Sequence, residues 1–295
     1  MNIYLAEFSG FCFGVRRAIQ LAEEAAGLGD KVCSMGELIH NPYIVNKLKQ
    51  QGILICDDFH KLTGHTVILR SHGVTREVLE TLTSNNNKIV DATCPYVLRA
   101  QKLAKSMAEE GYQVMIMGDK NHPEVIAIQS WGGKGTQIVG ADERPEPLPS
   151  SQICLIAQTT EKPQHLADLV AWLSTRVTEL RVFNTICLAT QQRQDASAQL
   201  AQELPLVIVI GGHNSSNTRQ LYQLCNQYSR CYHVAGEDEL KREWFCGLTD
   251  VGLAAGASTP AETIVAVYNR IKDINGESDR VTSVGEIPLF KEESC

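Results

Sequence analysis

Three cysteines stand in similar local settings and could act together as metal ligands. Cys12, Cys94 and Cys187 each follow a short run typical of a strand and precede a pattern typical of a helix. Thiolates are soft ligands that suit iron–sulfur clusters and zinc. The three lie roughly 80–90 residues apart, and the chain contains no CxxC pair. A short-range zinc ribbon or a thioredoxin-type motif is therefore excluded.

Three cysteines without a clear fourth partner favour a cubane iron–sulfur cluster that leaves one iron open to substrate. A zinc ion held by three cysteines is the competing interpretation, although zinc usually takes ligands from short-range pairs. The other seven cysteines have no counterparts in a repeat, and we expect them to be buried thiols that pack as small hydrophobic residues. They are Cys33, Cys56, Cys154, Cys225, Cys231, Cys246 and Cys295.

Each of the three cysteines begins a repeated pattern. A glycine follows each cysteine after 24 residues, at Gly36, Gly118 and Gly211, and opens a loop with His and Asn. A later loop in each repeat carries hydroxyl groups or histidine. These loops contain Ser71 and His72, Thr159 and Thr160, and Ser258 and Thr259. Because strand patterns alternate with helix patterns, the repeat predicts three homologous α/β units.

The repeat also predicts the domain limits. We expect units at 13–93, 94–187 and 188–280, with Cys187 at the boundary between the last two, and a C-terminal arm at 281–295 packed on the surface. Ligands of parallel α/β sheets bind at the carboxyl ends of the strands. If a pseudo-threefold axis relates the three units, their loops could converge on one central site.

The segment HNSSNT at 213–218 is a candidate anion site. It follows a strand pattern and precedes a helix pattern. Ser and Asn favour helix N-caps, so a purely structural role is the simpler interpretation. Ser215, Ser216 and Asn217 offer more donors than one cap needs, however, and helix N-termini bind phosphates. With Ser258 and Thr159 as further donors, the set suits a diphosphate.

Glu124 is the best candidate for proton delivery. It lies two residues after His122 in NHPE, and Pro123 between them restricts the loop. A carboxyl group in such a loop can act as a general acid. Among the histidines, His40, His72, His122 and His213 lie in the repeat loops, where either a structural or a ligand-binding role is open.

Length and composition narrow the classes of function. The 295 residues suggest two or three domains, and the net charge of −7 weighs against a nucleic-acid binder.

No apolar run reaches the ~18 residues of a membrane span. The N-terminal residues lack an export or organelle-targeting pattern, so we expect a cytoplasmic protein. No GxGxxG follows a strand pattern, so electrons for a redox step would come from a partner protein.

The motifs together resemble a known family. They are GFCFGVRRAI, ELIHNP, RSHGV, DATCP, NHPEV, QTT, TICLATQQRQ, GGHNSSNT and GASTP, spread over about residues 3–270. In this set and order the sequence resembles the 4-hydroxy-3-methylbut-2-enyl diphosphate reductases, an iron–sulfur family of the non-mevalonate isoprenoid pathway. Asn184 departs from the Asp expected before TIC, which puts little in doubt because that residue is not expected to be a ligand.

The resemblance implies a trefoil-like α/β fold of three pseudo-threefold-related units with parallel sheets around a central iron–sulfur cluster, and a role for each matching residue. It implies one 4Fe–4S cluster per chain, with one iron open to substrate and a tendency to degrade to 3Fe–4S, held by Cys12, Cys94 and Cys187. It assigns catalysis to Glu124, Thr159 and His122. It assigns substrate binding to His40, His72, His122, Ser215, Ser216, Asn217 and Ser258. It gives His213 no ligand role, so the suspicion raised by the repeat is set aside.

The implied reaction is a two-electron, two-proton reductive dehydroxylation that yields isopentenyl and dimethylallyl diphosphate. Ferredoxin or flavodoxin would supply the electrons, with no nucleic-acid or membrane partner. Three alternatives stay open. A hydro-lyase with the same cluster would turn over without a reductant, a non-catalytic sensor would bind without turnover, and a zinc-dependent phosphoryl hydrolase would keep its activity in air.

Overall fold

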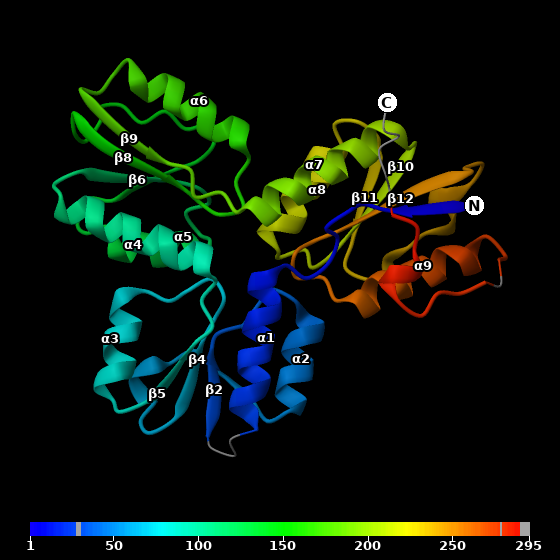
Figure 1. Ribbon diagram of the computed structural model, residues 1–295, viewed down its shortest axis with the longest axis horizontal. Helices are drawn as coiled ribbons and strands as arrows, with labels where there is room; N and C mark the ends of the chain where they lie inside the picture. The colour runs from blue at the N-terminus through cyan, green and yellow to red at the C-terminus, as the bar shows by residue number, and fades with distance from the viewer. Residues whose placement is uncertain (28–30, 278, 290–295) are drawn as a thin grey trace. The chain divides into compact units, whose positions relative to one another are not determined.

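The computed structural model describes residues 1–27, 31–277 and 279–289. Its described strands form three parallel sheets of four strands each, flanked by helices (Figure 1). The predicted α/β class with three parallel sheets is confirmed. The chain forms two compact units. The one-sheet unit contains Met1–Phe13, His40–Ile44 and Leu188–Cys295, and the two-sheet unit contains Gly14–Ile39 and Val45–Cys187.

The first sheet of the two-sheet unit has the strand order β3-β2-β4-β5. Its strands are β2 (Val32–Met35), β3 (Leu54–Cys56), β4 (Thr66–Leu69) and β5 (Lys88–Asp91). The helices in this part of the chain are α1 (Phe13–Ala26), α2 (Pro42–Gln50) and α3 (Arg76–Ser84), with a 3-10 turn at Phe59–Lys61. Thr75 caps α3, because its hydroxyl accepts the N–H of Val78 at 3.4 Å.

The second sheet of the two-sheet unit has the order β7-β6-β8-β9. Its strands are β6 (Gln113–Met117), β7 (Gln137–Val139), β8 (Gln152–Ala157) and β9 (Glu179–Phe183). The accompanying helices are α4 (Pro95–Glu109), α5 (Pro123–Trp131) and α6 (Pro163–Ser174). Each begins with a proline, which is tolerated at the first helical position because its missing N–H would have no intrahelical partner.

The one-sheet unit has the order β1-β12-β10-β11. Its strands are β1 (Asn2–Leu5), β10 (Leu206–Ile210), β11 (Arg230–Val234) and β12 (Asp250–Ala255). Its helices are α7 (Leu188–Glu203), α8 (Ser216–Cys225) and α9 (Ala261–Ile274), with 3-10 turns at Glu237–Glu239, Arg242–Phe245 and Val284–Glu286.

The three sheets share one topology if β1 is taken as the closing strand of the third. In each sheet the first strand in the repeat, β2, β6 or β10, lies between the second and third strands, and the fourth strand lies at the edge. Strand β1 fills that edge position, although it lies at the other end of the chain and outside the predicted range 188–280. The division into units at 13–93, 94–187 and 188–280 remains a prediction.

The central strands are buried on both faces, as expected for parallel sheets covered by helices. Along β10, Leu206, Ile208 and Ile210 pack in one core cluster, with residues of α9. Val207 and Val209 pack in a second cluster, with residues of α7 and α8. This alternation explains why the strand reads as a continuous apolar run. Within the described residues, no helix is both long enough and apolar enough to cross a bilayer.

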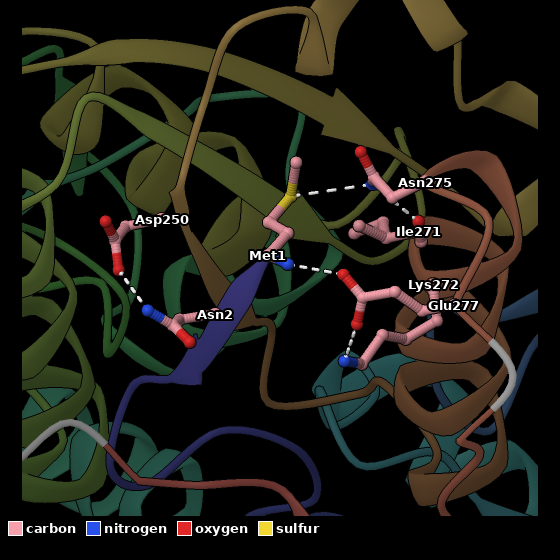
Figure 2. Close-up of polar contacts among 7 residues, drawn as sticks. All are labelled: Met1, Asn2, Asp250, Ile271, Lys272, Asn275 and Glu277. Carbon is pink, nitrogen blue, oxygen red and sulfur yellow. Dashed lines mark hydrogen bonds and ion pairs between the residues drawn. The ribbon is translucent and has the colours of Figure 1, made fainter.

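Polar contacts fix the N-terminal strand to its neighbours (Figure 2). The side chain of Asn2 donates to Asp250 Oδ1 at 2.9 Å, and Asn275 Nδ2 lies 3.6 Å from the sulfur of Met1. Glu277 pairs with both the N-terminal ammonium and Lys272. These contacts hold β1 at the edge of the sheet, and the loop between β1 and α1 carries Cys12.

The described part of the predicted C-terminal arm lies beside β1. The N–H of Leu5 donates to Pro288 O at 2.8 Å, and a parallel bridge joins Leu5 to Leu289. Ile287 is buried in the core cluster of the one-sheet unit, so the arm does more than cover the surface. The rest of the predicted arm, 290–295 with Cys295, lies outside the described residues.

Candidate functional site

The three repeat cysteines occupy equivalent backbone positions. Each follows the fourth strand of its sheet and stands directly before α1, α4 or α7. Each donates its backbone N–H to a carbonyl oxygen of the loop after the third strand: Cys12 to Ala257 at 3.2 Å, Cys94 to Ser71 at 2.9 Å and Cys187 to Thr159 at 2.9 Å. All three side chains are partly buried. Since helix N-termini favour nearby negative charge, the positions suit thiolates.

The turns before these cysteines are also alike. Asp91 Oδ1 accepts the N–H of Thr93 at 2.9 Å, and Asn184 Oδ1 accepts the N–H of Ile186 at 3.1 Å. Asp91 and Asn184 each stand three residues before a cysteine. Carboxylate and amide oxygens form this turn equally well, so asparagine at 184 leaves the geometry intact.

Two arginines hold the cysteine loops and were missed by sequence reasoning. Arg17 donates to Thr93 O at 3.2 Å and to Asp91 O at 3.1 Å, just before Cys94. Arg193 is 2% exposed and donates to Gly10 O at 2.9 Å, two residues before Cys12. Both arginines lie inside the motifs, but no spacing rule points from an arginine to a distant carbonyl.

The remaining cysteines mostly match the expected buried thiols. Cys33, Cys154, Cys225 and Cys231 are buried, and burial raises the pKa of the Cys33 and Cys154 thiols to about 12. Cys56 is half-buried. The expectation is wrong for Cys246, which is exposed because it ends the 3-10 turn Arg242–Phe245 at the surface, where its sulfur lies 3.8 Å from Arg242 O. Cys295 lies outside the described residues.

Glu124 and Thr159 form a buried pair in the two-sheet unit. Glu124 is 1% exposed in the first turn of α5, and its Oε1 accepts the N–H of Thr159 at 2.7 Å. The Thr159 hydroxyl donates to Glu124 Oε2 at 2.8 Å. Burial raises the pKa of the Glu124 carboxyl to about 7, since desolvation outweighs the two hydrogen bonds from Thr159. The carboxyl can therefore hold or release a proton near neutral pH.

His122 and His72 lie together in the same unit. His122 caps α5, where its Nδ1 accepts the N–H of Glu124 at 3.2 Å. That bond assigns the proton of the neutral ring to Nε2. The ring centroids of His72 and His122 are 5.5 Å apart, with the ring planes at 80°. The structure thus brings two of the predicted substrate-binding histidines to one place.

The candidate anion loop begins α8 in the one-sheet unit. Ser215 is the N-cap, and its Oγ accepts the N–H of Thr218 at 3.3 Å. Asn217 is 6% exposed, and neither polar atom of its amide has a partner among the described residues. Buried amides are nearly always hydrogen-bonded, so an unpartnered one points to a ligand. With the N–H groups of the first helical turn, the loop can bind an anion.

The loops of His40 and Ser258 meet beside the anion loop. Asn41 donates from Nδ2 to Ser258 O at 2.8 Å, and its Oδ1 accepts the N–H of Tyr43 at 3.0 Å. The Ser258 hydroxyl lies 3.5 Å from His40 O. Asn41 was not predicted as a functional residue, although it lies within the ELIHNP motif. It fixes the carbonyl group of Ser258 and stands between His40 and the first residue of α2.

The repeated glycine at the end of each first strand allows close packing. At Gly211, with φ of +149°, an added Cβ would lie 2.7 Å from the hydroxyl oxygens of Thr218 and Thr259. At Gly118 an added Cβ would lie 2.7 Å from Gln158 Oε1. No side chain fits there, which explains why glycine occupies these positions.

His213 lies apart from these candidate residues in character, since it is exposed and its ring pairs with Glu239 at 3.0 Å.

The Glu124 pKa predicts a pH-dependent stability. Because the folded pKa is raised from 4.5 to about 7, the native state binds more protons than the unfolded state between these values. Stability should therefore fall by roughly 3 kcal/mol as the pH rises from 4.5 to 7. The free energy of unfolding of Glu124→Gln, measured by chemical denaturation, should not show this fall between pH 4.5 and 7. An identical pH profile in the variant would contradict the assignment.

Comparison with known proteins gives one consistent result. The family model described as LytB protein matches residues 3–272. The chain is 42% identical over 277 residues to the 4-hydroxy-3-methylbut-2-enyl diphosphate reductase of Pelobacter propionicus, covering 93% of this chain and 99% of that one. It is 41% identical over 280 residues to the reductase of the same name from Aquifex aeolicus, covering 93% and 97%.

Two solved structures are similar over nearly the whole chain. A (E)-4-hydroxy-3-methyl-but-2-enyl diphosphate reductase, described as the terminal enzyme of the non-mevalonate pathway, is 40% identical with a TM-score of 0.68, covering 92% of this chain and 100% of that one. The E-1-hydroxy-2-methyl-but-2-enyl-4-diphosphate reductase from Plasmodium falciparum is 26% identical with a TM-score of 0.87, covering 98% and 95%.

Proposed function

We propose that this chain, which belongs to the LytB protein family and is a reductase, removes the hydroxyl group of 4-hydroxy-3-methylbut-2-enyl diphosphate. Two electrons and two protons convert the substrate into isopentenyl or dimethylallyl diphosphate and water. The observation that best supports this proposal is the buried Glu124–Thr159 pair. A reductive loss of hydroxide needs a proton near neutral pH, and this carboxyl can supply one.

A 4Fe–4S cluster fits the donor set that the chain offers. Cys12, Cys94 and Cys187 present three partly buried thiols at equivalent positions before helices, which suits a cluster with one iron open to substrate. When bound, such a cluster supplies single electrons and a Lewis-acidic iron. The chain's own part is to hold the three sulfurs, with Arg17 and Arg193 fixing two of the cysteine loops.

Glu124 and Thr159 would deliver the proton to the leaving hydroxyl. When Glu124 is protonated it donates to the Thr159 hydroxyl, which frees the hydrogen of that hydroxyl to be donated onward. At 2.8 Å the two oxygens are at the ordinary distance for this exchange. The leaving group then departs as water rather than hydroxide. His122 fixes the start of α5 and so the position of Glu124.

We infer that the loops of the one-sheet unit bind the diphosphate. Ser215, Ser216 and Asn217 at the start of α8, together with Ser258 and His40, offer hydroxyl, amide and imidazole donors. The same role for His72 and His122 rests on the sequence. Holding the diphosphate fixes the small hydrocarbon in place, which lowers the entropic part of the barrier.

Replacing Asn217 should weaken substrate binding more than it slows chemistry. Loss of a hydrogen bond to a charged group costs about 1.5–3 kcal/mol, so Asn217→Ala should raise KM by ~10–100-fold. Steady-state kinetics measure this effect. Asn226→Ala, at the exposed end of the same helix, is the matched control and should leave KM unchanged. An unchanged KM in the Asn217 variant would remove this residue from the site.

A one-electron carrier such as ferredoxin or flavodoxin is the proposed donor, because no dinucleotide motif is present in the sequence. The function can be tested anaerobically by following substrate loss with and without reduced methyl viologen. Turnover that needs the reductant and yields the two diphosphate products supports the proposal. Turnover without any reductant would indicate a hydro-lyase instead.

A further inference from the structure

A cavity of about 240 Å³ lies in the two-sheet unit, between β4, α4 and the end of α5. Its walls include the apolar side chains of Leu69, Val74 and Leu98 together with the indole of Trp131. We propose that this cavity binds a small amphipathic anion, with a short hydrocarbon chain and a carboxylate or phosphate head. The proposal is independent of the reductase reaction.

The apolar walls suit the hydrocarbon part of such a ligand. Ligand sites are mostly apolar, with a few polar groups that fix orientation. Leu69 at the end of β4 is 2% exposed and Val74 is 7% exposed, so both are part of the protein core. A hydrocarbon chain of a few carbons would gain the same burial in this space as a core side chain.

Two buried donors without acceptors suit the head group. Gln101 is 7% exposed and its Nε2 has no partner, and the indole Nε1 of Trp131 has none either, among the described residues. Both side chains line this cavity. Buried N–H groups nearly always donate a hydrogen bond, so two buried donors without partners at one cavity indicate that a ligand supplies the acceptor. A carboxylate or phosphate oxygen is such an acceptor.

The charges at the cavity favour an anion over a neutral acceptor. Lys102 is exposed and has no carboxylate partner among the described residues, and Lys105 forms only a 3.8 Å contact with Glu109. Asp91 is the one acidic residue of the lining, and its Oδ1 accepts the N–H of Thr93. Lysine ammonium groups bind phosphate and carboxylate heads as point charges.

The cavity lies near the proposed reaction site but does not include its residues. Gln101 packs against Gly73, where an added Cβ would lie 2.4 Å from Gln101 Nε2, and Gly73 follows His72. Helix α4, which carries Gln101, begins directly after Cys94. Neither His72 nor Cys94 lines the cavity, so a ligand here would bind beside the proposed reaction site and not in it.

Calorimetric titration of the holoprotein with hexanoate and hexyl phosphate tests the proposal. The controls are 1-hexanol, which has the hydrocarbon chain without the anionic head, and acetate, which has the anionic head without the chain. We expect saturable binding of one anion per chain, at least ~10-fold tighter than either half. Whichever of hexanoate and hexyl phosphate binds with the higher affinity identifies the preferred head group. The indole N–H resonance of Trp131 should shift on binding, while those of Trp172 and Trp244 should not.

The variant Trp131→Phe keeps the ring and removes the donor, and Lys102→Gln removes the charge. Each should weaken hexanoate binding by at least ~10-fold, whereas Trp172→Phe and Lys134→Gln should not. Thermal unfolding shows whether the variants remain folded. Absent binding, equal affinity for 1-hexanol, or full affinity in both folded variants would overturn the proposal. Reductase turnover in the variants should stay at the wild-type level.

Discussion

The variant Glu124→Gln is expected to lose about 10²–10⁴-fold in turnover, the range supplied by a positioned general acid. Glutamine keeps the size of the side chain and can still accept the N–H of Thr159, but it has no proton to deliver. The iron content and the KM should stay close to the wild-type values, because Glu124 belongs to neither the cysteine set nor the anion loop. Single-turnover measurements with a strong one-electron donor would separate this loss from slow electron entry.

The matched control is Glu77→Gln, which changes an exposed glutamate in the first turn of α3 in the same unit. Its turnover should equal that of the wild type. Thr159→Val should behave like the Glu124 variant, while Thr159→Ser should recover most of the activity because it restores the hydroxyl. Wild-type turnover in Glu124→Gln would remove Glu124 from the reaction.

The second large effect is expected for the three cysteines that are proposed to hold the cluster. Cys94→Ser replaces a soft thiolate by a hard hydroxyl that binds iron poorly. Turnover should therefore fall at least as far as the ~10–100-fold that loss of a ligand's supporting partner costs. Loss of the visible absorption of the purified protein should accompany the loss of turnover. Cys12→Ser and Cys187→Ser should give the same result, since the three cysteines occupy equivalent positions.

Cys246→Ser is the control for the cysteine series, because Cys246 is exposed and belongs to no repeat. It should keep both the absorption and the activity. If Cys94→Ser also kept full absorption and turnover, the assignment of the three cysteines would be wrong.

The repeat could be found from the sequence because strand and helix lengths fix it. The number of residues from each cysteine to its glycine equals the length of one helix, the following loop and one short strand. The same spacing therefore appears in every copy of the α/β unit. The residues at the ends of these elements, Cys94, Gly118 and Thr159 among them, could therefore be identified before any coordinates. The role of Asn184, by contrast, became clear only from the structure. Its amide oxygen forms the same turn that the carboxylate of Asp91 forms.

Contacts between distant parts of the chain could not be found in this way. Strand β1 pairs with β12 at the far end of the chain, and no local pattern indicates that partner. Arg17, Arg193 and Asn41 act by donating to backbone carbonyl groups, which carry no sequence signal. The raised pKa of Glu124 likewise depends on burial that the surrounding helix and loops create together.

The three repeat cysteines are proposed to hold an iron–sulfur cluster. The sharpest test measures iron and acid-labile sulfide per chain on anaerobically purified wild-type protein. We expect about three to four of each per chain, and their loss in Cys94→Ser. One tightly bound zinc ion without sulfide would contradict the cluster assignment and indicate a hydrolytic metal site at the three cysteines.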